Sequence, residues 1–263
     1  MTAEHLPDTQ NSKDTREIII DKVGIKDIIH PITYVDRDGN KVPTIGNFTM
    51  TVMLPAHVKG THMSRFVEIL NDGPCEFDPS NFNRIIDKVR TRLESDSAHI
   101  VLDFPFFRKK IAPSSGVESL MDYQVTLYGE LNQGNAEVMI KVVVPVTSLC
   151  PCSKSISKYG AHNQRSHITI KAKAAKGKVI YLEDLIELAE NKASCELYGI
   201  LKRDDEKFVT ERAYDNPAFV EDLVRDIAMA LNEDERITYY RLESENFESI
   251  HNHSAYALIE NQK

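Results

Sequence analysis

Apolar and polar residues alternate along residues 44–54, where Phe48, Met50, Val52 and Leu54 fall on one face of an extended chain. The preceding stretch, residues 23–35, is rich in isoleucine and ends in a turn cluster at residues 36–40. Two such stretches joined by a short turn predict a β-hairpin. Similar patterns predict further strands over residues 99–107, 123–131, 136–146, 166–174, 237–243 and 255–259.

Apolar residues at helical spacing predict helices over residues 61–71 and 182–191. Two more helices are expected to open at Asp78-Pro79 and Asn216-Pro217, because a capping side chain followed by proline is typical of a helix N-terminus. By contrast, the dense charges of residues 194–211 predict a solvated loop, in which a carboxylate could still complete a metal site.

The order of these elements is ββααββ, twice, with a boundary near Gln133-Gly134. Helices that fall between pairs of strands favour an α+β fold, with antiparallel sheets and the helices on one face. We therefore expect a disordered lead over residues 1–20 and two units, over residues 21–132 and 133–263. No strong residue-by-residue repeat relates the two halves, so the expected duplication is one of structure.

The chain of 263 residues carries a formal net charge of −8, and its 41 % hydrophobic and 27 % charged residues are ordinary for a globular protein. Binding to a nucleic-acid backbone needs a basic excess, so we expect no nucleic-acid partner, although a small anionic substrate needs only a few local cations. No apolar run approaches the roughly 18 residues of a membrane span, and no signal core begins the chain, so we expect no membrane partner and a cytoplasmic location. Neither a P-loop nor a dinucleotide-binding glycine motif occurs, which disfavours P-loop NTPases and Rossmann enzymes.

Residues 147–167 form the densest polar segment and connect two predicted strands. The segment carries Cys150, Cys152, His162 and His167. Thiolate and imidazole are preferred ligands of zinc and similar ions, and a catalytic site needs three protein ligands plus an open position for water. A disulfide across the single residue between Cys150 and Cys152 would be strained. The segment indicates a metal site or reactive thiols, and its alternative is a polar surface loop with incidental cysteines.

A second group of titratable residues lies between the last two predicted strands, at Glu243, Glu245, Glu248, His251 and His253. An extended backbone would place the two histidines on one side. Together they could transfer protons near neutral pH or bind a metal. The alternative is a solvated acidic turn with two surface histidines.

Basic residues gather in two places, at residues 59–65 and 108–110. In an acidic protein these are the expected docking points for anionic groups, and a helix N-terminus near Thr61 or Ser64 could add to them. Ordinary helix capping and surface solubility explain the same residues equally well.

Five segments, at residues 60–66, 104–110, 149–154, 159–167 and 245–253, closely resemble the type IB GTP cyclohydrolases, and the similarity runs over nearly the whole chain from about residue 23. The resemblance implies the tunnelling fold (T-fold), with two units in one chain and a homotetramer whose sites lie at subunit interfaces. It also implies the conversion of GTP and water to 7,8-dihydroneopterin triphosphate and formate, the first step of tetrahydrofolate biosynthesis.

Carried over residue by residue, the resemblance implies one divalent metal ion per site, which could be zinc, manganese(II) or iron(II). Its ligands fall on Cys150, His162 and Glu206. Glu221 becomes the anchor of the purine, since a carboxylate can accept two hydrogen bonds from the guanine edge. The remaining active-site positions are Cys152, Glu248, His251 and His253, and the candidate phosphate ligands are Lys59, His62, Arg65, Arg108 and Lys109.

The implied metal ion would lower the pKa of a water molecule from about 15.7 toward about 7, so that hydroxide attacks the guanine ring while His251 or His253 transfers protons. Glu221 would hold the base in place for this attack. Two other interpretations stay open. One is a related tunnelling-fold nitrile reductase of queuosine synthesis, with a cysteine nucleophile and a nicotinamide cofactor, and the other is a non-catalytic metal- or purine-binding protein.

Overall fold

The computed structural model describes residues 8–10, 12–132 and 134–263, which form two compact units. Unit 1 combines Met1–Tyr34, Pro43–Asp103 and Leu127–Val138, as far as these are described. Unit 2 combines Val35–Val42, Phe104–Thr126 and Met139–Lys263. Both units are discontinuous because long strands give residues to each, namely β4 (Ser97–Ile111), β5 (Glu118–Asn132) and β6 (Asn135–Leu149).

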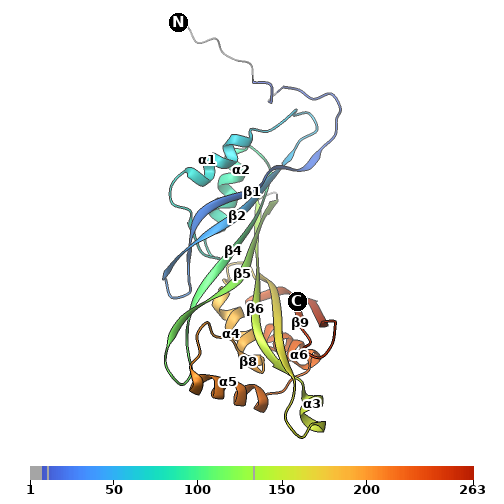
Figure 1. The fold of residues 1–263 in the computed structure, drawn as a ribbon. Coiled ribbons are helices and arrows are strands. Elements are labelled where there is room, and N and C mark those ends of the chain that lie inside the picture. The colour runs from blue at the N-terminus through green and yellow to red at the C-terminus, as the bar shows by residue number, and fades with distance from the viewer. Residues whose placement is uncertain (1–7, 11, 133) are drawn as a thin grey trace. The chain divides into compact units, whose positions relative to one another are not determined.

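Unit 1 consists mainly of antiparallel strands with two helices (Figure 1). β2 (Lys41–Leu54) pairs with β4 so that Met50 lies opposite Ile100, whereas the short β3 (Glu76–Phe77) pairs with β1 (Ile20–Val35) in parallel. The helices are α1 (Met63–Asn71) and α2 (Asn83–Arg92). The predicted alternation along residues 44–54 is confirmed, since Phe48, Met50 and Val52 are buried.

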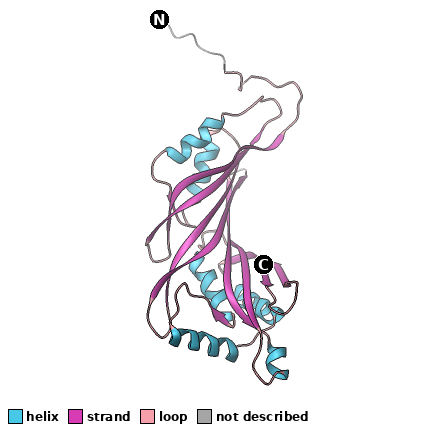
Figure 2. Ribbon diagram, viewed as in Figure 1, coloured by secondary structure: helices cyan, strands magenta, loops and turns pink. Residues whose placement is uncertain are grey.

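One close contact explains how α2 lies on the sheet of unit 1. A Cβ atom at Gly129 of β5 would come within 2.4 Å of Cδ1 of Ile86 in α2, and within 3.0 Å of the Phe82 ring. The missing side chain of Gly129 therefore lets the helix approach the strand. Figure 2 shows both helices on one side of the strands of unit 1. Full burial of an aliphatic or aromatic side chain such as these contributes about 1.5–3 kcal/mol.

Unit 2 holds the remaining elements. Its strands follow the order β10, β9, β7, β6, β5, β4, and β8 pairs with β6. The additional strands are β7 (Asn163–Ala174), β8 (Cys195–Glu196), β9 (Ile237–Asn246) and β10 (Ala255–Gln262). The helices are α3 (Pro151–Ile156), α4 (Leu182–Lys192), α5 (Arg203–Asp215) and α6 (Val220–Glu233). α6 packs on β9 and α4, and the core includes Val144, Ile168, Leu242, Ile186 and Ile227.

The predicted α+β class with antiparallel strands is confirmed. Apart from β3, the first half of the chain follows the predicted ββααββ order, while the second half adds α3, β8 and α5. The proposed division between residues 132 and 133 falls at the turn between β5 and β6, and it stays a prediction.

Two predicted helix starts are wrong. α2 begins at Asn83 and not behind Asp78-Pro79, because the Asp78 carboxylate accepts hydrogen bonds from the backbone N–H groups of residues 80 and 81 and closes a turn. α6 begins at Val220, while Asn216 is the C-cap of α5. Asp78-Pro79 therefore marks a turn before α2, whereas Asn216-Pro217 marks the end of α5 and precedes α6.

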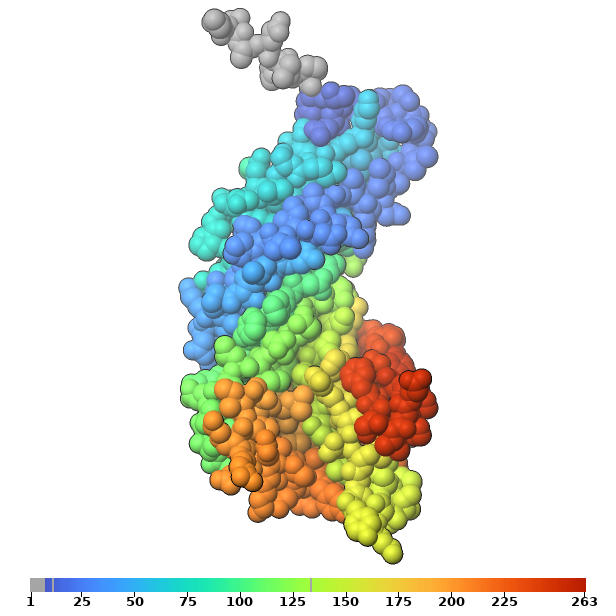
Figure 3. All heavy atoms as spheres, in the orientation of Figure 1, coloured from blue at the N-terminus to red at the C-terminus, as the bar shows by residue number. Residues whose placement is uncertain are grey.

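The predicted loop over residues 194–211 is also wrong, because its second part belongs to α5. Most charges of α5 lie on its exposed sides, where Figure 3 shows this segment in orange, while Asp205 and Ala213 are buried. A helix with such a narrow buried side has little apolar periodicity, so charge density misled the prediction.

Residues 1–7 and 11 of the predicted N-terminal lead lie outside the described residues. Within the described part, backbone hydrogen bonds join Asp14 to His57 and Lys59 to Ser12. No helix in the described ranges is long and apolar enough to cross a membrane.

Candidate active site

The Cys-Pro-Cys segment lies where β6 ends and α3 begins. Cys150 is the N-cap of α3, Pro151 takes the first helical position, and the backbone N–H of Ser153 donates to the Cys150 sulfur at 3.4 Å. The N–H of Cys150 donates to the carbonyl oxygen of His162 at 3.1 Å, just before β7. This bond joins the two ends of the polar connection and brings the thiol and imidazole residues together.

The ring of His162 is oriented by a buried polar network. Its Nδ1 lies 3.0 Å from Oε1 of Gln164, whose Nε2 donates to the Ser148 hydroxyl at 2.8 Å. Ser166 donates to the same hydroxyl at 2.8 Å. Because the amide nitrogen of Gln164 donates to Ser148, its oxygen faces the ring and can accept the N–H of the tautomer that is protonated at Nδ1. Nε2 of His162 then keeps its lone pair for a ligand.

A small core holds α5 against these two residues. It consists of Leu149, Cys195 and Ala213, with Ala161 and Val209 packed on it. Residues 149 and 161 directly precede Cys150 and His162, so α5 turns the side that carries Val209 and Ala213 toward them. Glu206 precedes Val209 by three positions and therefore lies on the same side, one turn earlier.

The three predicted metal ligands do not form a closed set. In the part of the chain that the structure describes, no group of three His, Cys, Asp or Glu side chains could hold a metal ion. Glu206 and Cys152 are exposed, while Cys150 and His162 are half-buried. The structure thus brings two of the three together and presents the third on the helix side that faces them.

The first turn of α5 is fixed by Asp205, the neighbour of Glu206. Its buried carboxylate accepts hydrogen bonds from Ser114, Ser115 and Lys202. Burial by itself raises the pKa of Asp205, but these hydrogen bonds outweigh burial and hold the pKa below its usual range. Asp205 is therefore a carboxylate at neutral pH.

The segment between β9 and β10 carries Glu248 close to His162. The N–H of Phe247 donates to the carbonyl oxygen of Arg165 at 3.0 Å, and its ring meets the ring of His167 edge-on at 4.8 Å. Burial lowers the pKa of His167, which favours its neutral form. Oε2 of Glu248 lies 4.0 Å from Nδ1 of His162. Glu248 therefore lies beside His162, and its role in the active site stays a prediction.

His251 and His253 lie on the same side of the chain, as predicted. Their rings stack with centroids 5.1 Å apart and an angle of 14° between the planes. The backbone at these residues bends and is not an extended strand, so strand alternation does not explain why the two rings lie on one side. Both rings are exposed and lie side by side, and their role in proton transfer stays a prediction.

Glu221 lies in the exposed first turn of α6. The N–H of Ala218 donates to the carbonyl oxygen of Leu149 at 3.2 Å, so the chain just before α6 is joined to the residue before Cys150. The predicted purine anchor therefore begins a helix that is tethered to the loop of the predicted metal ligands.

Lys59, His62 and Arg65 belong to unit 1. His62 lies 3.2 Å from Asp8, and Arg65 lies 3.5 Å from Glu94, while Lys59 is exposed. His62 and Arg65 line a cleft of about 1150 Å³ beside α1 and α2, whose other charged residues have both signs. This cleft shows no excess of positive charge, and a phosphate role for the three residues stays a prediction.

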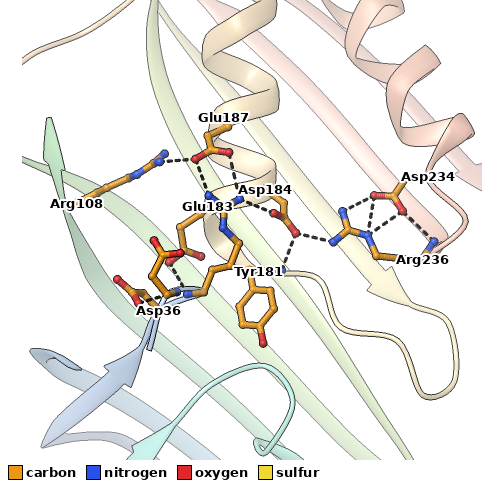
Figure 4. A network of polar contacts seen from close by, with 10 residues as sticks. Asp36, Arg108, Tyr181, Glu183, Asp184, Glu187, Asp234 and Arg236 are labelled. Carbon is orange, nitrogen blue, oxygen red and sulfur yellow. Dashed lines mark hydrogen bonds and ion pairs between the residues drawn. The ribbon is translucent and has the colours of Figure 1, made fainter. Parts of the chain in front are cut away.

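Arg108 and Lys109 belong to unit 2, and both are paired with carboxylates. Arg108 forms an ion pair with Glu187 of α4, which also binds Arg37 (Figure 4). Lys109 lies 2.6 Å from Glu118. A phosphate group would have to compete with these carboxylates, so their role as phosphate ligands also stays a prediction.

Sequence reasoning missed the residues that orient the site, above all Gln164, Ser166 and Asp205. A signal existed for the first two. Residues 164, 166, 168 and 170 of β7 are all buried and share one face, so the alternation of Ile168 and Ile170 could have been extended backward. The bond from Lys202 to Asp205 is local, but no local signal marks the contacts with Ser114 and Ser115, which lie about 90 residues away.

Comparison with known proteins identifies the family. Residues 6–257 match the family described as Type I GTP cyclohydrolase folE2. The chain belongs to this family. It is 81 % identical over 263 residues to the GTP cyclohydrolase FolE2 of Ruthia magnifica subsp. Calyptogena magnifica, with both chains covered completely. It is 58 % identical over 258 residues to the protein of the same name in Nitrosococcus oceani, which covers 98 % of this chain and 96 % of that one.

Among solved structures, the fold is similar to that of urate oxidases. The uricase of Arthrobacter globiformis matches with a TM-score of 0.52 at 9 % identity, over 92 % of this chain and 93 % of that one. A highly active mutant of the Bacillus sp. TB-90 urate oxidase matches with a TM-score of 0.53 at 9 % identity, over 93 % and 100 %. At this identity the likeness shows a shared fold and does not extend to chemistry.

Proposed function

We propose that this chain is a GTP cyclohydrolase I that converts GTP and water to 7,8-dihydroneopterin triphosphate and formate, the first step of tetrahydrofolate biosynthesis. The observation that carries the proposal is the family match over residues 6–257, which includes the joined residues Cys150 and His162. Fold likeness alone would not support it, since the urate oxidases share only the fold.

One divalent metal ion per site, zinc, manganese(II) or iron(II), would be held by Cys150, His162 and Glu206. In chemical type these donors suit such an ion, although the described residues form no closed group of three: a thiol sulfur that already accepts an N–H, an imidazole, and the exposed carboxylate of Glu206 in the first turn of α5. When bound, the ion supplies Lewis-acid activation of water at neutral pH.

The remaining residues bind the substrate and move protons. Glu221 accepts two hydrogen bonds from the guanine edge and so orients the base toward the Cys150 loop. The stacked rings of His251 and His253 transfer protons, and Glu248 orients the His162 side of the site. Cys152 is a second thiol for proton transfer, and the phosphates would bind among Lys59, His62, Arg65, Arg108 and Lys109.

The proposed assembly is a cytoplasmic homotetramer of the tunnelling fold, with two ββααββ units in each chain and active sites at subunit interfaces. The strands and helices in each half of the chain support the two units per chain. The exposed positions of Glu206, Glu221 and the two histidines suit a site that a neighbouring subunit completes.

The test is to add each metal in turn to the metal-free protein with GTP, and to measure fluorescent pterin and formate over many turnovers. Glu206→Ala should remove metal binding and turnover together. Glu211→Ala, which changes an exposed glutamate of the same helix, should keep both within about twofold. Binding of GTP without turnover would contradict the proposed catalytic function. Consumption of NADPH with a nitrile substrate would identify the protein as a nitrile reductase instead.

A further inference from the structure

We propose that Asp205 is a positioning residue for the metal site, because it fixes the first turn of α5 and thereby aims Glu206 at Cys150 and His162. This inference rests on the proposed role of Glu206 as a ligand. Asp205 itself is completely buried, so it does not reach a ligand or substrate directly.

The contacts of Asp205 join two distant parts of unit 2. One carboxylate oxygen accepts from the N–H groups of Ser114 and Ser115, each at 2.8 Å. The other accepts from the Ser115 hydroxyl at 2.6 Å and from the N–H of Lys202 at 2.8 Å. The turn between β4 and β5 is thus tied to the start of α5.

A helix cap alone does not require this many contacts. Asp222 holds the same third position in α6 and accepts from the N–H of Phe219 at 3.3 Å, with an exposed side chain. Asp205 makes the equivalent bond to Lys202 and adds those from Ser114 and Ser115. The added bonds fix the helix start to the rest of unit 2, which a cap does not do.

The other contacts of α5 hold its middle and its last turn, but not its first turn. Its middle is seated by Val209 in the small core, and its last turn by Arg212, which lies 3.0 Å from Glu196. Glu206 comes before both contacts, in the first turn, where helix ends open most readily. The bonds of Asp205 are therefore what holds the Glu206 backbone in place.

The experiment measures Co²⁺ binding to the metal-free full-length protein by its absorption spectrum, without GTP. Asp205→Asn should raise the Co²⁺ dissociation constant about tenfold or more, as expected when a residue behind a ligand is changed, and should alter the bands that report the coordination number. Asp222→Asn makes the same chemical change at the matching position of α6 and should leave both readouts as in the wild type. If Asp205→Asn does not fold, Ser115→Ala, which removes the bond at 2.6 Å, should give a smaller shift in the same direction.

A double variant separates positioning from general destabilisation. If Asp205 acts through Glu206, then Asp205→Asn should not weaken Co²⁺ binding further in a Glu206→Ala background. Wild-type affinity in folded Asp205→Asn, or a full additional loss in the double variant, would overturn the inference. Unchanged affinity in Glu206→Ala alone would instead show that the proposed metal ligand is wrong, so the two failures can be told apart.

Discussion

Gln164 orients His162 through a single bond, and its own orientation depends on the hydroxyls of Ser148 and Ser166. Gln164, Ser148 and Ser166 are all buried, so losing a hydrogen bond among them costs free energy that water does not restore. The consequence at the scale of one residue is that the buried Gln164 faces Nδ1 of His162 and leaves Nε2 for the proposed metal ion.

Gln164→Leu should therefore raise the zinc dissociation constant about 10–100-fold, because Nδ1 of His162 loses its acceptor. Gln164→Glu keeps an acceptor for the ring but loses the N–H donated to Ser148, so it should lose less zinc affinity than Gln164→Leu. Competition with a chromophoric chelator measures both. An equal loss in the two variants would mean that packing, and not the hydrogen bond, is what matters at this position.

Glu183 is a buried carboxyl group of α4, with only 4 % of its surface exposed. Its Oε1 accepts from the N–H of Arg37, while Oε2 has no hydrogen-bond partner among the described residues. Burial raises the pKa of Glu183 above its ordinary value of 4.5, and nearby Asp36 raises it further. Figure 4 shows both acidic groups close to α4.

A raised pKa means that the folded state keeps a proton that the unfolded state has released. Stability should then fall as pH rises from about 4.5 through the folded pKa of Glu183. Glu183→Gln stays neutral, so its stability relative to the wild type should increase between pH 5 and pH 8 in urea unfolding. A difference that does not change with pH would contradict this assignment.

At the scale of elements, α5 is the helix on which the site depends most. It is seated on β8 by Arg212, which lies 3.0 Å from Glu196, and Glu196 also accepts from Tyr198 at 2.5 Å. The exposed fractions of these side chains, 31 % for Arg212 and 14 % for Glu196, show that the pair is partly buried. Other pairs of α5, such as Lys207 with Glu211, are exposed.

Arg212→Met should lower the free energy of unfolding by about 1–3 kcal/mol, because it leaves the partly buried Glu196 carboxylate without the guanidinium that pairs with it. Lys207→Met breaks the exposed pair of the same helix and should cost less than about 0.5 kcal/mol. Urea unfolding of the two variants measures the contrast. Equal losses would show that the Arg212 pair contributes no more than a surface pair.

At the scale of the whole molecule, the proposed tetramer predicts a light-scattering mass of four times the chain mass of 29.8 kDa. Because active sites would lie at subunit interfaces, turnover per chain should fall on dilution together with that mass. Full activity in a protein with the mass of one chain would contradict the interface sites.

Much of the fold follows from the sequence, because alternation in strands and apolar stripes in helices depend only on near neighbours along the chain. Phe48, Met50 and Val52 are buried as predicted, and each predicted strand is present. The helix starts at Asp78 and Asn216 were misplaced because Asp78 closes a turn and Asn216 caps the end of the preceding helix.

By itself, the sequence determined the α+β class and the family, since its long motifs around Cys150, His162 and Glu248 are specific however the chain folds. Only the tertiary structure decided that residues 203–215 are a helix, that Asp205 is buried and that Gln164 orients His162. The physical reason is distance along the chain: the bond from Ser115 to Asp205 spans 90 positions, and no local pattern can encode such a partner.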